Sequence, residues 1–171
     1  ISDRLVELVA STATGDHEPL LAYIDARHAA LASELGVDPA QVADDLASLR
    51  RVATGAALLG EATPSVHARI LAHGELLSTR LGAAWLAAQG LPVTWVDARE
   101  LLFSDGRGGP ERSFLGAHVA PGADPALAAR LPTGVVLTQG FIATNPEGRT
   151  VLLGRGGSDT SAALLAGRLE S

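Results

Sequence analysis

Apolar residues recur at spacings of three and four through the first half of the chain, between Asp3 and Gly90. Two runs show this spacing well, with Leu20, Leu21, Ile24 and Leu31 in the first and Val42, Leu46 and Leu49 in the second. Because residues three and four positions apart share one face of a helix, this half is predicted to be helical, with three long helices.

Start and stop signals indicate where these helices begin and end. Gly36 is predicted to end one helix, and Asp38 with Pro39 to begin the next as N-cap and first-turn residues. Thr63-Pro64 repeats that start signal, so the last helix is predicted to run to Gln89.

The second half changes to short β-branched runs separated by turns. Residues 93–96 are predicted to form a buried strand, residues 134–141 and 149–153 two further strands, and residues 125–130 a short helix. Strands that alternate with helices indicate an α/β fold with a mostly parallel sheet.

Composition and charge narrow the class of protein. The 171 residues are 47% hydrophobic and carry a net charge of −6, so one domain with a sizeable core is expected and a broad nucleic-acid-binding face is not. No apolar run has the roughly 20 residues that a membrane span needs, which predicts a cytoplasmic protein without a membrane partner. The chain has no cysteine, and its five histidines lack regular metal-site spacing, so no metal site is predicted and a metal would arrive with a substrate.

The clearest candidate site lies where a predicted strand runs into the last helix. Gly154-Arg155-Gly156-Gly157 joins the two, and Ser158-Asp159 is predicted to cap the helix. Glycines let the backbone approach a ligand, helix-start amides carry partial positive charge, and an arginine fork binds carboxylate or phosphate. The pattern therefore indicates an anion site, with a plain glycine turn and ordinary caps as the alternative.

Two further features point to ligand contacts more weakly. Gly74, Ser78 and Gly82 form a stripe of small residues on the long helix, and Glu75 beside it either faces a ligand ammonium group or is an ordinary helix carboxylate. Phe141 ends a predicted strand and begins a loop, where it either contacts a ligand or belongs to the core. Residues 105–110 are predicted to be a mobile turn, because glycine and proline at this density favour loops. A phosphate site there is not favoured, because no helix is expected to follow the segment.

Taken together, these segments resemble the aspartate kinase family of the amino-acid kinase superfamily. The resemblance rests on residues 154–159 followed by Ser161-Ala162-Ala163, on Gly74-Glu75-x-x-Ser78 and on Gly140-Phe141. Residues 1–5 also resemble the family segment that ends a strand, with Ser2 in place of a usual threonine. The resemblance implies a three-layer α/β/α sandwich, incomplete in this chain. It also implies transfer of the ATP γ-phosphoryl group to the side-chain carboxylate of L-aspartate, the first step of lysine, threonine and methionine biosynthesis.

The resemblance also implies roles for individual residues. Arg155 would bind the α-carboxylate of aspartate and Glu75 its ammonium group, a pair that suits a zwitterionic amino acid. Asp159 would organise phosphoryl transfer from ATP with Mg²⁺. The other implied site residues are Ser2, Phe141 and Ser158, which would line the pocket, and Gly156 and Gly157, which would form the anion-binding turn.

The chain also departs from the family pattern. The family begins with a glycine-rich segment whose lysine neutralises phosphates, whereas all 13 basic residues here are arginine. Residues 1–171 are therefore interpreted as an internal part of the catalytic domain of an aspartate kinase, or of a fusion enzyme that contains one. The isolated chain is expected to lack kinase activity, and the full-length enzyme is expected to be a homo-oligomer.

Two other functions stay open at this point. One is a kinase for another acidic substrate, such as glutamate or acetylglutamate, and the other is a non-catalytic module for amino-acid binding or oligomerisation. Glu75 separates the first from aspartate kinase, because an acetylated substrate has no ammonium group to pair with its carboxylate.

Overall fold

The computed structural model describes residues 1–169, which form two compact units that meet in sequence between Leu91 and Pro92. Each unit is described by itself. The prediction that both belong to one catalytic domain stays a prediction.

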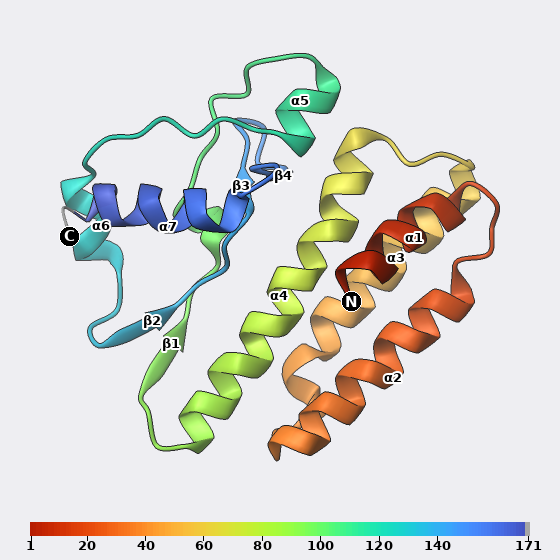
Figure 1. Ribbon diagram of the computed structural model, residues 1–171, viewed down its shortest axis with the longest axis horizontal. Helices are drawn as coiled ribbons and strands as arrows, with labels where there is room; N and C mark the ends of the chain where they lie inside the picture. Colours follow the sequence, from red (N-terminus) through yellow and green to blue (C-terminus); the bar gives the residue numbers. More distant parts are fainter. Residues whose placement is uncertain (170–171) are drawn as a thin grey trace. The chain divides into compact units, whose positions relative to one another are not determined.

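The first unit is entirely helical within its described residues (Figure 1). Its elements are α1 (Ser2–Thr12), α2 (Glu18–Leu35), the 3-10 turn η1 (Pro39–Val42), α3 (Ala43–Leu59) and α4 (Pro64–Ala88). The three predicted long helices are thus confirmed as α2, α3 and α4.

The predicted helix ends are confirmed by their backbone geometry. Gly36 ends α2 in the left-handed conformation at φ 66°, where a residue without a Cβ has no steric penalty. The Asp38 carboxylate accepts the backbone N–H of Ala40, although it opens η1 rather than α3 directly. The Thr63 hydroxyl accepts the N–H of Val66 at the start of α4.

Helix α1 is the main difference from the predictions for this half. Residues 1–5 were expected to end a strand, but this is wrong, because Ser2 is the first residue of α1. Leu5 and Leu8, one helical turn apart, are 1% and 0% exposed and join the core of the first unit. Burial of this apolar face stabilises the helix.

The second unit contains four short strands and three short helices among its described residues. In chain order the elements are β1 (Val93–Trp95), η2 (Ala98–Glu100), α5 (Pro110–Leu115), α6 (Pro125–Arg130), β2 (Val135–Leu137), β3 (Ile142–Thr144), β4 (Thr150–Leu152) and α7 (Gly157–Arg168). The predicted helix at residues 125–130 is confirmed as α6.

The strands form two separate pairs. β1 and β2 are parallel, with Val93 opposite Val135, whereas β3 and β4 are antiparallel, with Ile142 opposite Leu152. A mixed α/β fold is therefore confirmed for the chain. β1 differs from the prediction of a buried strand, because Thr94 is exposed.

Strand β3 was not predicted, and β2 is shorter than predicted. The predicted strand at residues 134–141 ends at Leu137, because the chain turns through residues 138–141 before it enters β3. Ile142 and Ala143 of β3 are both fully buried, and Ala143 packs in the core of the second unit with Leu102 and Val151. The turn at residues 138–141 is therefore fixed between two buried elements, and it leads to the candidate site.

Candidate functional site

The predicted anion-binding turn connects β4 to α7 in the second unit. All three residues of β4 are buried, so its position is fixed by the core. Gly154 and Gly156 adopt left-handed conformations at φ 75° and 72°, and the N–H of Gly157 donates to the carbonyl of Gly154. Glycine is needed at both positions, because a residue with a Cβ is strained at positive φ.

The start of α7 differs from the prediction in a way that matters for binding. Ser158 and Asp159 were predicted to cap the helix, but this is wrong, because Gly156 is the N-cap and, within the described residues, no side chain accepts a hydrogen bond from the N–H groups at the helix start. The N–H groups of Ser158 and Asp159 have no acceptor among the described residues. Free N–H groups at a helix start, with the helix dipole behind them, favour an anion.

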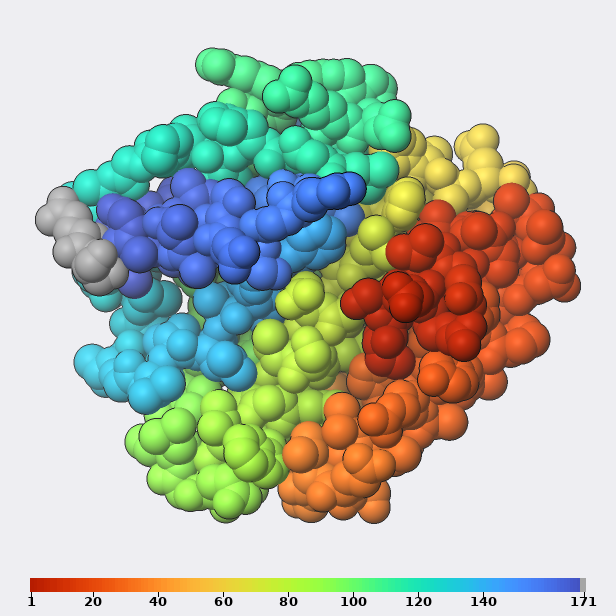
Figure 2. Space-filling view, in the orientation of Figure 1, coloured from red at the N-terminus to blue at the C-terminus, as the bar shows by residue number. Residues whose placement is uncertain are grey.

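Arg155 stands at this turn and faces solvent. It is exposed, and within residues 1–169 its guanidinium makes no hydrogen bond or ion pair. The carboxylate of Asp159, in the first turn of α7, is likewise exposed and has no bonding partner in the described part of the chain. The surface of α7 is visible in dark blue in the space-filling view (Figure 2). A cation and a carboxylate are thus both available to a ligand at the start of α7.

Phe141 lies beside this turn in a strained backbone conformation. Its φ of 69° makes it the single non-glycine residue with positive φ among the described residues. The N–H of Ile142 donates to the carbonyl of Gly140 at 2.8 Å, which closes a γ-turn with Phe141 at its centre. A bulky residue in such a turn costs about 1–3 kcal/mol, and strain of this kind concentrates at ligand-binding sites.

Two glycines let the Phe141 turn approach α7. A Cβ on Gly140 would lie 2.8 Å from the Cα of Ser158, and a Cβ on Gly157 would lie 2.7 Å from Cδ2 of Phe141. Both distances are shorter than real Cβ contacts allow. Gly140, Phe141, Gly157 and Ser158 therefore form one closely packed group.

Two buried residues that hold this region were not among the predicted site residues. The Ser161 hydroxyl accepts the N–H of Phe141 at 2.9 Å, and the Gln139 side chain accepts the N–H of Ala98 at 2.7 Å. Both residues are 1% exposed. Ser161 lies in a quoted motif and Gln139 directly precedes Gly140-Phe141, which was the available signal in the sequence. Their hydrogen-bond partners belong to other elements and cannot be read from the sequence.

The other two predicted site residues, Ser2 and Glu75, lie in the first unit. A Cβ on Gly74 would lie 3.1 Å from Cδ1 of Leu5, so α1 packs against α4 beside Glu75, and Ser2 is one helical turn before Leu5. The element that packs closely against Gly74 is therefore helix α1. Burial raises the pKa of Glu75 above its ordinary value. A carboxylate that is costly to ionise alone would gain from a cationic ligand group.

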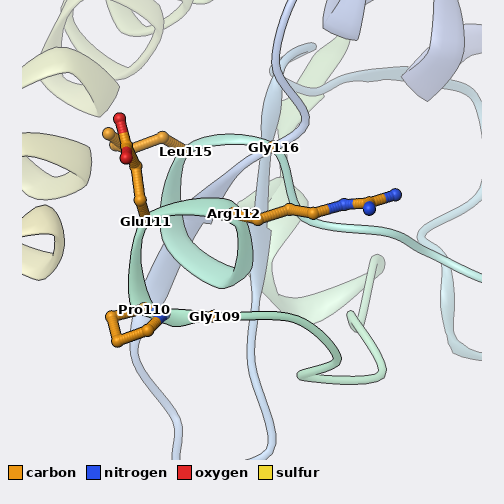
Figure 3. Close-up of a pocket in the computed structure, with 6 residues that line it drawn as sticks. All are labelled: Gly109, Pro110, Glu111, Arg112, Leu115 and Gly116. Atoms are coloured by element: carbon orange, nitrogen blue, oxygen red, sulfur yellow. The ribbon is translucent and has the colours of Figure 1, made fainter.

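The glycine-rich segment at residues 105–110 also differs from its prediction. It was dismissed as a phosphate site because no helix was expected after it, but α5 begins at Pro110. The hollow beside α5 is lined by Gly109, Pro110, Glu111, Arg112, Leu115 and Gly116 (Figure 3). The Arg112 side chain points away from those of Glu111 and Leu115. The opposite charges of Arg112 and Glu111 therefore do not converge on one ligand.

The segment before α5 is held by Asp105. Its carboxylate accepts the N–H of Arg107, and its Oδ2 lies 2.9 Å from Nδ1 of His118. These two interactions lower the pKa of Asp105, the Arg107 N–H having the larger effect.

The described residues do not form a metal site by themselves. No group of three or more histidine, aspartate or glutamate residues among them is arranged to hold a metal ion. Asp159 is a single carboxylate, so a Mg²⁺ ion at this site would need the phosphates of a nucleotide for most of its ligands.

In the described part of the chain, no helix combines the length and apolar character needed to cross a membrane.

Comparison with known proteins identifies the family. Residues 7–171 match the sequence pattern of the amino acid kinase family, and the chain belongs to that family. Among its relatives, lysine-sensitive aspartokinase 3 of Escherichia coli is 39% identical over 109 residues, which cover 64% of this chain and 24% of that protein. Bifunctional aspartokinase/homoserine dehydrogenase 2 of Escherichia coli is 40% identical over 136 residues, which cover 74% of this chain and 16% of that protein.

A solved structure shows the same fold. The crystal structure of E. coli aspartokinase III in complex with aspartate and ADP matches with a TM-score of 0.78 and 30% identity, covering 98% of this chain and 38% of that chain. The chain thus resembles aspartokinases throughout its length, while it spans about a quarter or less of the two curated relatives named above.

Proposed function

We propose that this chain is the aspartate-binding part of an aspartate kinase, which transfers the γ-phosphoryl group of ATP to the side-chain carboxylate of L-aspartate. One observation carries the proposal: the exposed Arg155 guanidinium and the free N–H groups of the first turn of α7 lie beside the strained turn at Phe141. This arrangement suits a small anion with a specific shape. That the two relatives and the solved structure named above are aspartokinases supports aspartate as that anion.

Each end of the amino acid has a complementary group. The planar fork of Arg155 binds the α-carboxylate with two parallel hydrogen bonds. The carboxylate of Glu75, whose pKa is raised by burial, pairs with the ammonium group, which stabilises its charged form. The family resemblance also assigns Ser2, Phe141 and Ser158 to the binding of the same substrate.

For phosphoryl transfer, the protein mainly has to position the reacting groups and stabilise their charge, rather than form a covalent intermediate. An oxygen of the substrate's side-chain carboxylate forms a bond to the γ-phosphorus of ATP, the bond from that phosphorus to the β-γ bridging oxygen breaks, and ADP leaves with those electrons. The turn at Gly156 and Gly157 leads into the free N–H groups of Ser158 and Asp159, which bind the negative charge, and the Asp159 carboxylate orients the reacting groups. Mg²⁺, bound mainly by the nucleotide, would neutralise phosphate charge.

The family relationship supports further proposals about the whole protein. They are a three-layer α/β/α sandwich with a mostly parallel sheet, a homo-oligomeric enzyme and a cytoplasmic location. The match to aspartokinase III over 98% of this chain supports the first of these.

The test is a kinase assay on the whole protein that contains this chain. ATP-dependent formation of aspartyl phosphate, trapped as the hydroxamate, is expected, and Arg155→Ala should lower kcat/KM for aspartate roughly ten- to a hundred-fold, as for lost hydrogen bonds between charged groups. Arg149→Ala is the matched control, because Arg149 is an exposed arginine of the same unit outside the site. Equal losses in both variants would contradict the role of Arg155, and phosphorylation of N-acetylglutamate in preference to aspartate would contradict the proposed substrate.

A further inference from the structure

The backbone of Phe141 is held at both of its polar groups. Its N–H donates to Oγ of Ser161 at 2.9 Å, and its carbonyl accepts the N–H of Leu153 at 2.8 Å. Leu153 directly follows β4, whose position is fixed by the core, and Ser161 lies in α7. Hydrogen bonds thus join the strained turn to the end of a buried strand on one side and to a helix on the other.

The Ser161 hydroxyl uses both of its hydrogen-bonding functions in this arrangement. While it accepts the N–H of Phe141, it donates to the carbonyl of Gly157 at 2.8 Å. Gly157 is the first residue of α7, next to Ser158 in the proposed pocket. One buried hydroxyl therefore links the Phe141 turn to the first turn of α7.

We propose that Ser161 is a positioning residue, which holds the Phe141 ring and the first turn of α7 at the spacing that L-aspartate requires. The inference rests on the proposed function of the site. Ser161 is 1% exposed and does not itself reach a ligand. It acts through Phe141, whose left-handed conformation is costly and persists only while its surroundings fix it.

Loss of the hydroxyl has a definite physical consequence. Alanine at position 161 leaves the Phe141 N–H without its acceptor, and an unmet hydrogen bond in a partly buried site favours a change of backbone conformation. Relaxation of Phe141 out of the left-handed region would turn its ring away from Gly157, against which it now packs.

The neighbouring residue offers a matched control. Thr160 donates its hydroxyl to the carbonyl of Gly156 at 3.0 Å, so it makes the same kind of bond within the same helical turn. It is exposed, and the hydrogen bond from the Phe141 N–H goes to Ser161 instead. Thr160→Ala therefore removes a hydroxyl from the helix and leaves the two hydrogen bonds of Ser161 in place. Ser161→Thr keeps the hydroxyl and serves as the conservative variant.

The experiment combines a structural and a functional measurement on the full 171-residue chain and its three variants. NMR gives the φ-dependent coupling constant and the hydrogen exchange rate of the Phe141 amide, and titration with L-aspartate gives the dissociation constant. Ser161→Ala is expected to speed Phe141 exchange and weaken aspartate binding, each by about tenfold, which corresponds to one hydrogen bond of about 1.4 kcal/mol. Thr160→Ala should stay within about twofold of the parent chain, because Thr160 is exposed. Ser161→Thr keeps the acceptor for the Phe141 N–H and should have a smaller effect on both quantities than Ser161→Ala.

The outcomes separate this inference from the proposed function. If the parent chain binds no aspartate, the proposed function is wrong for this chain and so is the role of Ser161 in aspartate binding, while the Phe141 signals still decide whether Ser161 fixes the turn. If the parent binds aspartate and Ser161→Ala binds it equally well, or if Thr160→Ala weakens binding as much, the positioning role is overturned and the proposed function stands.

Discussion

At the scale of single residues, the site depends on the close approach of Phe141 to Gly157. The two residues touch so closely that a single added carbon atom at position 157 would lie 2.7 Å from the phenylalanine ring and 3.2 Å from the Phe141 Cα. Since Phe141 is bonded at both its N–H and its carbonyl, it cannot move away freely. This contact makes the site sensitive to substitutions that other helical positions tolerate.

Gly157→Ala is therefore expected to destabilise the chain, whereas Gly167→Ala should not. Overpacking of this kind costs about 1–3 kcal/mol. A Cβ on Gly167, in the same helix, would meet no atom within 4 Å, so there alanine should be neutral or stabilising by up to about 1 kcal/mol. Urea unfolding of both variants measures the difference, and equal free energies of unfolding would show that the close contact is absent.

The pKa of Glu75 gives a second prediction at this scale. Burial raises it above the ordinary value of 4.5, so the folded state binds the proton more tightly than the unfolded state. The stability that this group contributes is fully present below about pH 4.5 and is lost as the pH rises through the folded pKa. Glu75→Gln cannot ionise, so its free energy of unfolding relative to the parent should rise with pH.

Urea unfolding from about pH 4 to about pH 7 checks this direction. Glu61→Gln is the control for loss of one negative charge, because Glu61 is exposed in the loop between α3 and α4. A rise that Glu61→Gln reproduces would be an effect of net charge and would contradict the account of Glu75.

At the scale of elements, the helices were more predictable than the strands. Gly36 and Thr63 mark helix ends through local backbone geometry, so the sequence shows them directly. The start of α7 was misplaced because serine and aspartate are common N-caps, whereas here the left-handed Gly156 begins the helix two residues before Ser158. Strand β3 was missed because its three residues become a strand only through pairing with β4.

The packing of α3 against α4 includes an ion pair that the sequence could not assign. Nε of Arg80 lies 2.5 Å from Oδ2 of Asp45, and Asp45 is 9% exposed. Arg80→Ala is expected to destabilise the chain by about 1–3 kcal/mol, because it leaves a nearly buried carboxylate without this partner. Arg27→Ala, which breaks an exposed pair with Glu34, should change stability by less than about 0.5 kcal/mol. Thermal unfolding of the two variants compares them, and similar melting temperatures would contradict this account.

At the scale of the whole molecule, the sequence motifs were sufficient for the family but not for the arrangement of the site. Residues 154–159 indicated an anion site from their chemistry alone, and the structure adds why that site is open: the helix start has no side-chain cap. The link that holds the γ-turn at Phe141 to Ser161 joins residues 20 positions apart. Such contacts follow from tertiary packing, which periodicity and composition do not specify.

The central claim is that the start of α7 binds L-aspartate through Arg155. The most direct measurement is an NMR titration of the 171-residue chain with L-aspartate and, separately, with N-acetylglutamate, in the parent and in Arg155→Ala. L-aspartate is expected to shift the amide signals of Phe141 and Ser158 in the parent. Arg155→Ala is expected to lose most of this response, and N-acetylglutamate is expected to bind more weakly. Amide signals that do not respond to L-aspartate, or that respond equally in Arg155→Ala, would contradict this claim.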